Sequence, residues 1–156
     1  MTLMSCVPVR TIETDDAYLA KSIVENSIVK NYLVEGDEIR LPLTDVESSV
    51  EEGAKVFVSR ESGHCVLCHK IADIGASFQG NLGPDLSTVG ARLTRAQLRY
   101  RIVDASRLNP HTIMPPYYRT LGLSQVATEV VGETVLNEIQ IEQLVKFLAS
   151  KGGSPE

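Results

Sequence analysis

One pentapeptide constrains most strongly what this chain can fold into. Cys65 and Cys68 are separated by two residues, and His69 follows directly. A tight turn of this length can place both sulfurs along one edge of a haem, where each adds across a vinyl group. The adjacent imidazole then projects beneath the ring toward the iron. The motif therefore predicts one covalently bound haem c, with His69 as an axial ligand.

Two other interpretations of the motif stay open. A Cys-x-x-Cys pair can form a redox disulfide, or it can supply half of a zinc site. A zinc site needs further ligands at similar spacing, and outside the motif the chain offers Cys6, His64 and His111. These three do not form a second pair, so the spacing favours haem. We expect His64 at the surface, because the attachment turn holds it.

The composition is typical of one globular domain with an extra arm. The chain has 156 residues, of which 43% are hydrophobic and 5% aromatic, so aliphatic packing alone gives a light core that a haem can complete. A net charge of −5 without a basic stripe excludes nucleic acid as a partner. A run of about 18 apolar residues is absent from the sequence, so we expect no membrane span.

The first ten residues lack the charged and apolar segments of a signal peptide. We therefore interpret the chain as one from which a leader has been removed. Covalent haem attachment in bacteria takes place outside the cytoplasmic membrane, so we expect a periplasmic protein.

Residues 1–43 and 152–156 flank the expected haem-binding domain. Residues 14–32 begin with an acidic turn and carry apolar residues at helical spacing, so we expect a helix there. Apolar residues alternate from 39 to 43, which is typical of a short extended segment. We assign this N-terminal extension to docking on a partner; the alternative is a helix that packs on its own domain. The tail at 152–156 is expected to be frayed.

Residues 44–151 are expected to form the haem-binding domain. Residues 44–47 read Thr-Asp-Val-Glu, a capping box, and predict that a helix begins at Thr44. A glycine inside a helix costs about 0.5–1 kcal/mol relative to alanine, so Gly53 predicts a close crossing by another helix. The expected crossing partner is the last helix, which Asn137 caps.

A middle helix and two long loops are expected to complete the domain. The helix begins at Thr94, with Gln97 at the capping-box position, and ends before Asn109. Residues 71–90 and 110–132 are rich in Gly, Pro, Ser and Thr and read as loops. Loops of this length are unusual in a compact domain unless another group, here a haem, orders them.

Met114 is the expected second axial ligand. A haem bound by one imidazole leaves one axial position, commonly filled by a thioether or a second imidazole. Met114 and His111 both follow the motif at a suitable distance, and the prolines on either side of Met114 stiffen its loop. We favour Met114; ligation by His111, and a purely core-filling role for Met114, remain the alternatives.

The carbonyl of Pro84 is expected to accept the Nδ1 proton of His69. The sequence Gly-Pro-Asp-Leu at residues 83–86 reads as a turn that follows the haem motif. Such a hydrogen bond fixes the tautomer so that Nε2 faces the iron. A turn without this role is the alternative.

Several motifs together carry a resemblance to a known family. They are Cys65-Val-Leu-Cys-His69, Gly80-Asn-Leu-Gly-Pro84, Leu93-Thr-Arg-Ala-Gln-Leu98, Arg101-Ile-Val-Asp104, Asn109-Pro110 and Met114-Pro-Pro-Tyr-Tyr-Arg119. The chain resembles the SoxX family, the small cytochrome subunits of the SoxAX complexes of sulfur-oxidising bacteria. The resemblance covers about residues 50–148, and the block that ends at Arg119 is its most specific part.

The resemblance implies a fold, a reaction and partners. The implied fold is the all-α class I cytochrome c fold, with crossing N- and C-terminal helices, a loop-rich haem pocket and an N-terminal extension. A SoxA-like dihaem or monohaem cytochrome would supply the catalytic cysteine of an L-cysteine S-thiosulfotransferase, which couples thiosulfate oxidatively to a cysteine of the carrier SoxYZ. This chain, with no catalytic residue of its own, would accept the electrons and pass them to a downstream cytochrome. The alternative is a stand-alone periplasmic cytochrome c that serves another oxidoreductase.

Four further residues receive roles at this point. Cys6 is left over from the haem motif, and we expect a disulfide to the SoxA-like partner; the alternative is a terminal cysteine without a role. Tyr117, Tyr118 and Arg119 are expected to brace the Met114 loop. Alternatively, Arg119 pairs with a haem propionate, because a guanidinium matches a carboxylate bidentately.

Overall fold

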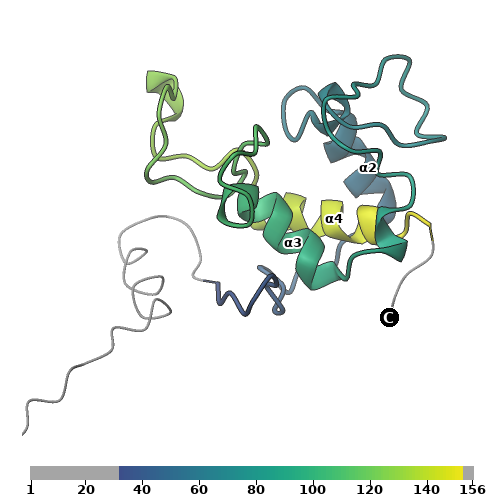
Figure 1. The fold of residues 1–156 in the computed structure, drawn as a ribbon, viewed down its shortest axis with the longest axis horizontal. Helices are drawn as coiled ribbons and strands as arrows, with labels where there is room; N and C mark the ends of the chain where they lie inside the picture. The colour runs from purple at the N-terminus through teal and green to yellow at the C-terminus, as the bar shows by residue number, and fades with distance from the viewer. Residues whose placement is uncertain (1–31, 153–156) are drawn as a thin grey trace, which may run out of the picture.

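The structure, a computed structural model, describes residues 32–152, and these form helices and loops (Figure 1). The three α-helices are α2 (Val50–Val58), α3 (Arg95–Asp104) and α4 (Glu138–Ala149). Short 3-10 turns lie at η1 (Cys65–Leu67), η2 (Val89–Ala91), η3 (Ala105–Arg107) and η4 (Thr128–Val130). The all-α cytochrome c fold expected from the sequence is confirmed. Within residues 32–152, no helix is long and apolar enough to cross a membrane.

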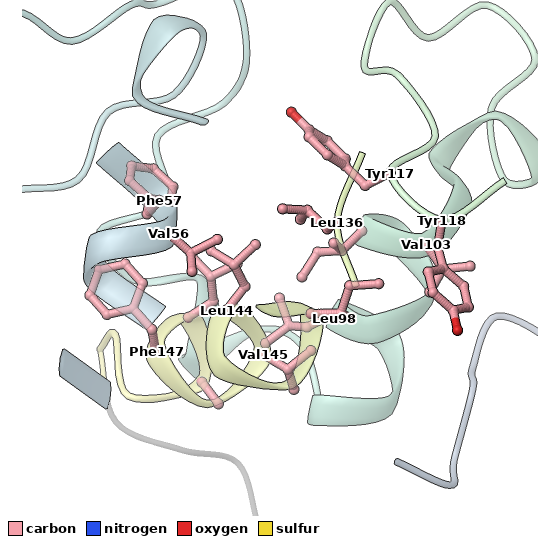
Figure 2. Close-up of a cluster of buried hydrophobic side chains, with 14 of the residues drawn as sticks. Val56, Phe57, Leu98, Val103, Tyr117, Tyr118, Leu136, Leu144, Val145 and Phe147 are labelled. Carbon is pink, nitrogen blue, oxygen red and sulfur yellow. The ribbon is translucent and has the colours of Figure 1, made fainter. Parts of the chain in front are cut away.

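Helices α2 and α4 cross closely, as Gly53 predicts. A Cβ at Gly53 would collide with the carbonyl oxygen of Gln143 and with the side chain of Phe147 on α4. Phe57 and Phe147 lie next to the crossing with their ring centroids 5.7 Å apart (Figure 2). The absence of a side chain at Gly53 therefore brings the two backbones together and buries both rings.

Helix α2 begins later than the sequence predicts. Its N-cap is Ser49, whose hydroxyl accepts a hydrogen bond from the backbone N–H of Glu52 at 3.0 Å. The predicted cap, Thr44, instead accepts from the backbone N–H of Val46 in a local turn at 3.2 Å. Val46 is 52% exposed and is not part of the buried stripe. The helix start at Thr44 is therefore wrong, because a hydroxyl can satisfy a nearby amide without starting a helix.

The capping box predicted at Thr94 and the cap predicted at Asn137 are confirmed. Thr94 caps α3 and bonds reciprocally with Gln97, while Asn137 caps α4 and bonds reciprocally with Gln140. Helix α3 ends at Asp104 and continues into a single 3-10 turn before Asn109. The buried side chains of all three helices meet in one core (Figure 2).

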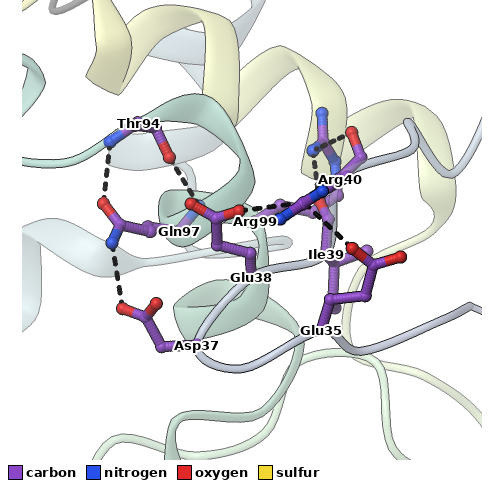
Figure 3. A network of polar contacts seen from close by, with 8 residues as sticks. All are labelled: Glu35, Asp37, Glu38, Ile39, Arg40, Thr94, Gln97 and Arg99. Atoms are coloured by element: carbon purple, nitrogen blue, oxygen red, sulfur yellow. Dashed lines mark hydrogen bonds and ion pairs between the residues drawn. The ribbon is translucent and has the colours of Figure 1, made fainter.

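Residues 32–43 pack on the helices of the same chain. Ile39 and Leu43 are buried while Leu41 is 75% exposed, which is the alternation expected from the sequence. Arg99 of α3 donates to the carbonyl oxygen of Ile39 at 2.7 Å, and Gln97 donates to Asp37 at 3.0 Å (Figure 3). The helix expected at residues 14–32, together with Cys6 and the tail after residue 152, lies outside the described residues. The docking role of the extension stays a prediction.

A buried ion pair links α3, α4 and this N-terminal segment. Arg99 contacts Glu142 through two hydrogen bonds of 2.6 and 2.7 Å. The same carboxylate accepts from the backbone N–H of Leu43 at 3.0 Å. The side chains of Arg99 and Glu142 are only 4% and 9% exposed, so each charge depends on its partner.

Candidate functional site

The two cysteines and the histidine of the motif lie on one compact turn. His64 has a φ of 44° and starts this turn, which the 3-10 helix η1 continues. The backbone N–H groups of Cys68 and His69 both donate to the carbonyl oxygen of Cys65, at 3.1 and 2.9 Å. Neither cysteine is in a disulfide, and both are partly buried. His64 is half-buried rather than exposed, because the turn holds it against its neighbours.

The imidazole of His69 is held on two sides by the loop that follows. Its Nδ1 lies 2.9 Å from the carbonyl oxygen of Pro84, which leaves Nε2 as the free ring nitrogen. A Cβ at Gly83 would collide with the ring. The backbone N–H of Gly83 donates to the carbonyl oxygen of Cys68 at 2.8 Å, which fixes the loop to the attachment turn.

Backbone hydrogen bonds hold the same loop along its length. Gly80 donates to the carbonyl oxygen of Val66 at 2.9 Å, and Leu86 donates to that of Lys70 at 2.8 Å. A Cβ at Gly80 would collide with the carbonyl oxygen of Leu67. The two glycines at 80 and 83 therefore allow the loop to approach the backbone of the motif and the His69 ring. Sequence reasoning did not single them out, although both lie in the motif that ends at Pro84.

Cys65 lies in an apolar environment. Burial raises the pKa of its thiol to about 12, so the free side chain stays a neutral thiol at ordinary pH. Zinc is bound by thiolates and needs three or more protein ligands. Within residues 32–152, no three His, Cys, Asp or Glu side chains lie close enough together to hold a metal ion. Among the described residues, this turn therefore lacks the further ligands that a zinc site needs.

The Met114 loop joins α3 to the attachment turn. Met114 is half-buried against the core, and its backbone N–H donates to the hydroxyl of Thr112 at 3.2 Å. Three residues further, Tyr117 donates through its backbone N–H to Ile102 of α3 at 3.3 Å and through its hydroxyl to the carbonyl oxygen of Gly63 at 3.0 Å. The loop is thus fixed both to α3 and next to Cys65.

His111 and Arg119 do not take part in the contact between Tyr117 and Gly63. His111 is exposed, and its backbone N–H donates to Asn109 at 3.0 Å. Arg119 contacts the buried carboxylate of Asp104 at 3.2 Å and so ties the end of the Met114 loop to the end of α3. The Nε of Arg119 is buried without a partner among the described residues. The pairing of Arg119 with a propionate stays a prediction, as do the ligand roles of His69 and Met114.

The arrangement of these residues fits a haem c. The turn offers two thiols at attachment spacing and an imidazole whose tautomer is fixed by a backbone carbonyl. Gly83, which borders the ring of His69, makes room for the loop beside it. The carbonyl of Pro84 occupies the place that outer-shell acceptors take for a metal-bound histidine.

Comparison with known proteins supports this interpretation. Residues 50–151 match the cytochrome c family. A chain in the crystal structure of SoxXA from P. pantotrophus is 29% identical, with a TM-score of 0.70, and the match covers 76% of this chain and 93% of that one. This match confirms the resemblance to SoxX. The c-type cytochrome SorU from Sinorhizobium meliloti is 20% identical with a TM-score of 0.42, over 67% of this chain and 92% of that one. The search of proteins with curated descriptions found no match.

Proposed function

The chain belongs to the cytochrome c family, and we propose that it is the electron-accepting subunit of a SoxAX-type complex that couples thiosulfate to a carrier cysteine. The observation that carries the proposal is the match to a chain of SoxXA at a TM-score of 0.70 over 93% of that chain. The covalently bound haem c of the family carries one electron at a time between ferric and ferrous iron.

The residues of the attachment turn hold and orient the group in this proposal. Cys65 and Cys68 form the two thioethers. His69 presents Nε2 to the iron, because its Nδ1 proton is directed to the carbonyl oxygen of Pro84 at 2.9 Å. Met114 would supply a second protein ligand from a loop whose far end is fixed by the Tyr117 hydroxyl. A haem held by both side chains would leave no place for a substrate and would be suited to outer-sphere electron transfer.

The reaction explains why an electron acceptor is needed. Coupling thiosulfate to a carrier thiol forms one S–S bond, breaks one S–H bond, and releases two electrons and one proton. The catalytic cysteine is assigned to a SoxA-like cytochrome and the substrate thiol to SoxYZ. This chain takes up the electrons one at a time and delivers each to a downstream cytochrome. Because haem attachment takes place outside the cytoplasmic membrane, we place the complex in the periplasm.

A reconstitution tests the proposal. The oxidised holoprotein is mixed with a SoxA-like protein, SoxYZ and thiosulfate, and reduction is followed by visible absorption. We expect reduction in the complete mixture and none when the SoxA-like protein or SoxYZ is left out. The holoprotein and the SoxA-like protein are also expected to co-elute in gel filtration. Separate elution with no reduction in the complete mixture would contradict the proposal and leave a stand-alone cytochrome that serves another oxidoreductase.

A further inference from the structure

We propose that the hydroxyl of Tyr117 is a positioning group that closes the Met114 loop over the attachment turn and thereby retains Met114 on the iron. This inference rests on the proposed function only in taking Met114 as the second ligand. Tyr117 is not itself a ligand, and its role is exerted through Met114.

The hydrogen bond of Tyr117 joins the two segments that carry the proposed ligands. Its hydroxyl donates to the carbonyl oxygen of Gly63 at 3.0 Å, although the two residues are 54 positions apart. Tyr117 lies three residues after Met114, and Gly63 lies two residues before Cys65. The bond therefore spans from the distal loop to the turn that bears both thioethers and His69.

Both ends of this bond are held rigidly. The backbone N–H of Tyr117 donates to Ile102 at 3.3 Å, and its carbonyl oxygen accepts from Leu136 at 3.0 Å. At the other end, a Cβ at Gly63 would lie 2.9 Å from the carbonyl oxygen of Val56 and 3.0 Å from the sulfur of Cys65. Gly63 is thus enclosed between α2 and the first thioether position. A hydrogen bond between two fixed segments resists their separation.

The surroundings of Tyr117 favour its hydrogen bond to Gly63. The side chain is 9% exposed, so water competes little for the hydroxyl. Burial raises the pKa of Tyr117, and the phenol remains a donor at ordinary pH. Figure 2 shows the rings of Tyr117 and Tyr118 pointing in opposite directions, so the neighbouring phenol cannot replace it.

The Met114 loop has two states in this proposal: a closed state with the hydrogen bond from Tyr117 to Gly63, and an open state without it. The proposal takes release of the Met114 thioether to involve movement of its loop, which would separate Tyr117 from Gly63. The hydrogen bond exists in the closed state alone, so its free energy adds directly to the closed population. Breaking it also leaves a buried carbonyl without a donor, which makes the bond worth more than an exposed one.

Competition with imidazole measures this contribution. Imidazole is titrated into the ferric holoprotein, and loss of the red thioether-to-iron absorption band reports displacement of Met114. In the Tyr117→Phe variant, we expect imidazole to displace Met114 at a concentration about tenfold lower than in the wild type. This factor is equivalent to about 1.4 kcal/mol. Phenylalanine keeps the ring and its packing, so the substitution removes the hydroxyl alone.

Tyr118→Phe is the matched control. It removes a buried phenol hydroxyl from the next residue and leaves the contact between Tyr117 and Gly63 intact. Its midpoint is expected within about twofold of the wild type, well below the worth of one buried hydrogen bond. Equal midpoints for the two variants overturn the proposal, and so does a wild type without the red band. Failure of the thiosulfate reconstitution alters neither result, so the two proposals fail separately.

Discussion

The helical side of the molecule and its loop side are stabilised in different ways. We define the helical side as α2, α3 and α4, and the loop side as residues 59–88 and 109–118. The helices bury their apolar faces against one another, and their caps are satisfied within the chain. Between residues 72 and 88 no side chain is buried, and Phe78 is 91% exposed.

Short backbone hydrogen bonds and close glycine contacts, rather than buried side chains, give residues 72–88 their shape. Gly80, Gly83 and Leu86 donate to carbonyls of residues 66–70, next to the haem motif. The helices therefore form a support, while the loops are arranged around Cys65, Cys68 and His69. The two sides should therefore respond differently to loss of the haem and to damage in the core.

Removal of both attachment cysteines gives the largest expected effect. In a Cys65→Ala, Cys68→Ala variant, no pigment should remain with the chain after denaturing electrophoresis, because both thioethers are lost. Hydrogen exchange should show that the amides of Gly80 and Gly83 lose protection, while those of α2 and α4 keep part of theirs. Equal loss on both sides would show that the helices depend on the haem as much as the loops do.

Breaking the buried ion pair should damage the helical side strongly. Glu142→Gln leaves the guanidinium of Arg99 buried without a counter-charge, and we expect a loss of about 3–5 kcal/mol in the free energy of unfolding. Denaturant unfolding followed by circular dichroism measures it. The control is Glu52→Gln, which removes an exposed pair with Lys55 and should cost at most about 1 kcal/mol. A similar loss in both variants would mean that burial of the Arg99 pair does not increase its contribution to the free energy of unfolding.

The crossing of α2 and α4 gives a third test. Gly53→Ala introduces a Cβ that collides with the backbone of Gln143, and the strain should lower the free energy of unfolding by about 1–3 kcal/mol. The position of the visible absorption bands should stay the same, since the substitution is on the helical side. Glu51→Ala, at an exposed position of the same helix, is the control. A variant as stable as this control would contradict the close crossing.

The caps are expected to have the smallest effect. Thr94→Ala and Asn137→Ala each remove one side-chain acceptor from the first turn of a helix, and each should cost about 1 kcal/mol. Because the caps are on different helices and share no partner, the double variant should lose the sum of the two. Thermal unfolding of the three variants checks this. A combined loss far from the sum would show that the caps are coupled.

Features that depend on residues close together in the chain could be predicted from the sequence. The capping box at Thr94 and the cap at Asn137 each involve residues within one turn of the chain, and both are confirmed. Gly53 could be assigned to a helix crossing because glycine destabilises the interior of a helix relative to alanine, and a close approach by another helix explains its presence. The start at Thr44 was wrong because Ser49 offers a second cap, and tertiary contacts decide between them. One is the hydrogen bond from the backbone N–H of Leu43 to a carboxylate on α4.

Two contacts between residues far apart in the chain were not visible in the sequence. The haem motif is a single pentapeptide and could be read directly. The contact of Tyr117 with Gly63, and the pair of Arg99 with Glu142, join residues that no spacing rule relates. Such contacts become visible only when the helices bring their loops together.

The visible spectrum of the purified protein, before and after denaturing extraction, shows whether the chain carries a covalently attached haem with Met114 as a ligand. We expect the pigment to stay with the chain, and the ferric protein to show a red thioether-to-iron band which Met114→Ala abolishes. Colourless protein from a host competent in cytochrome maturation, or pigment that leaves the chain on extraction, would contradict this expectation.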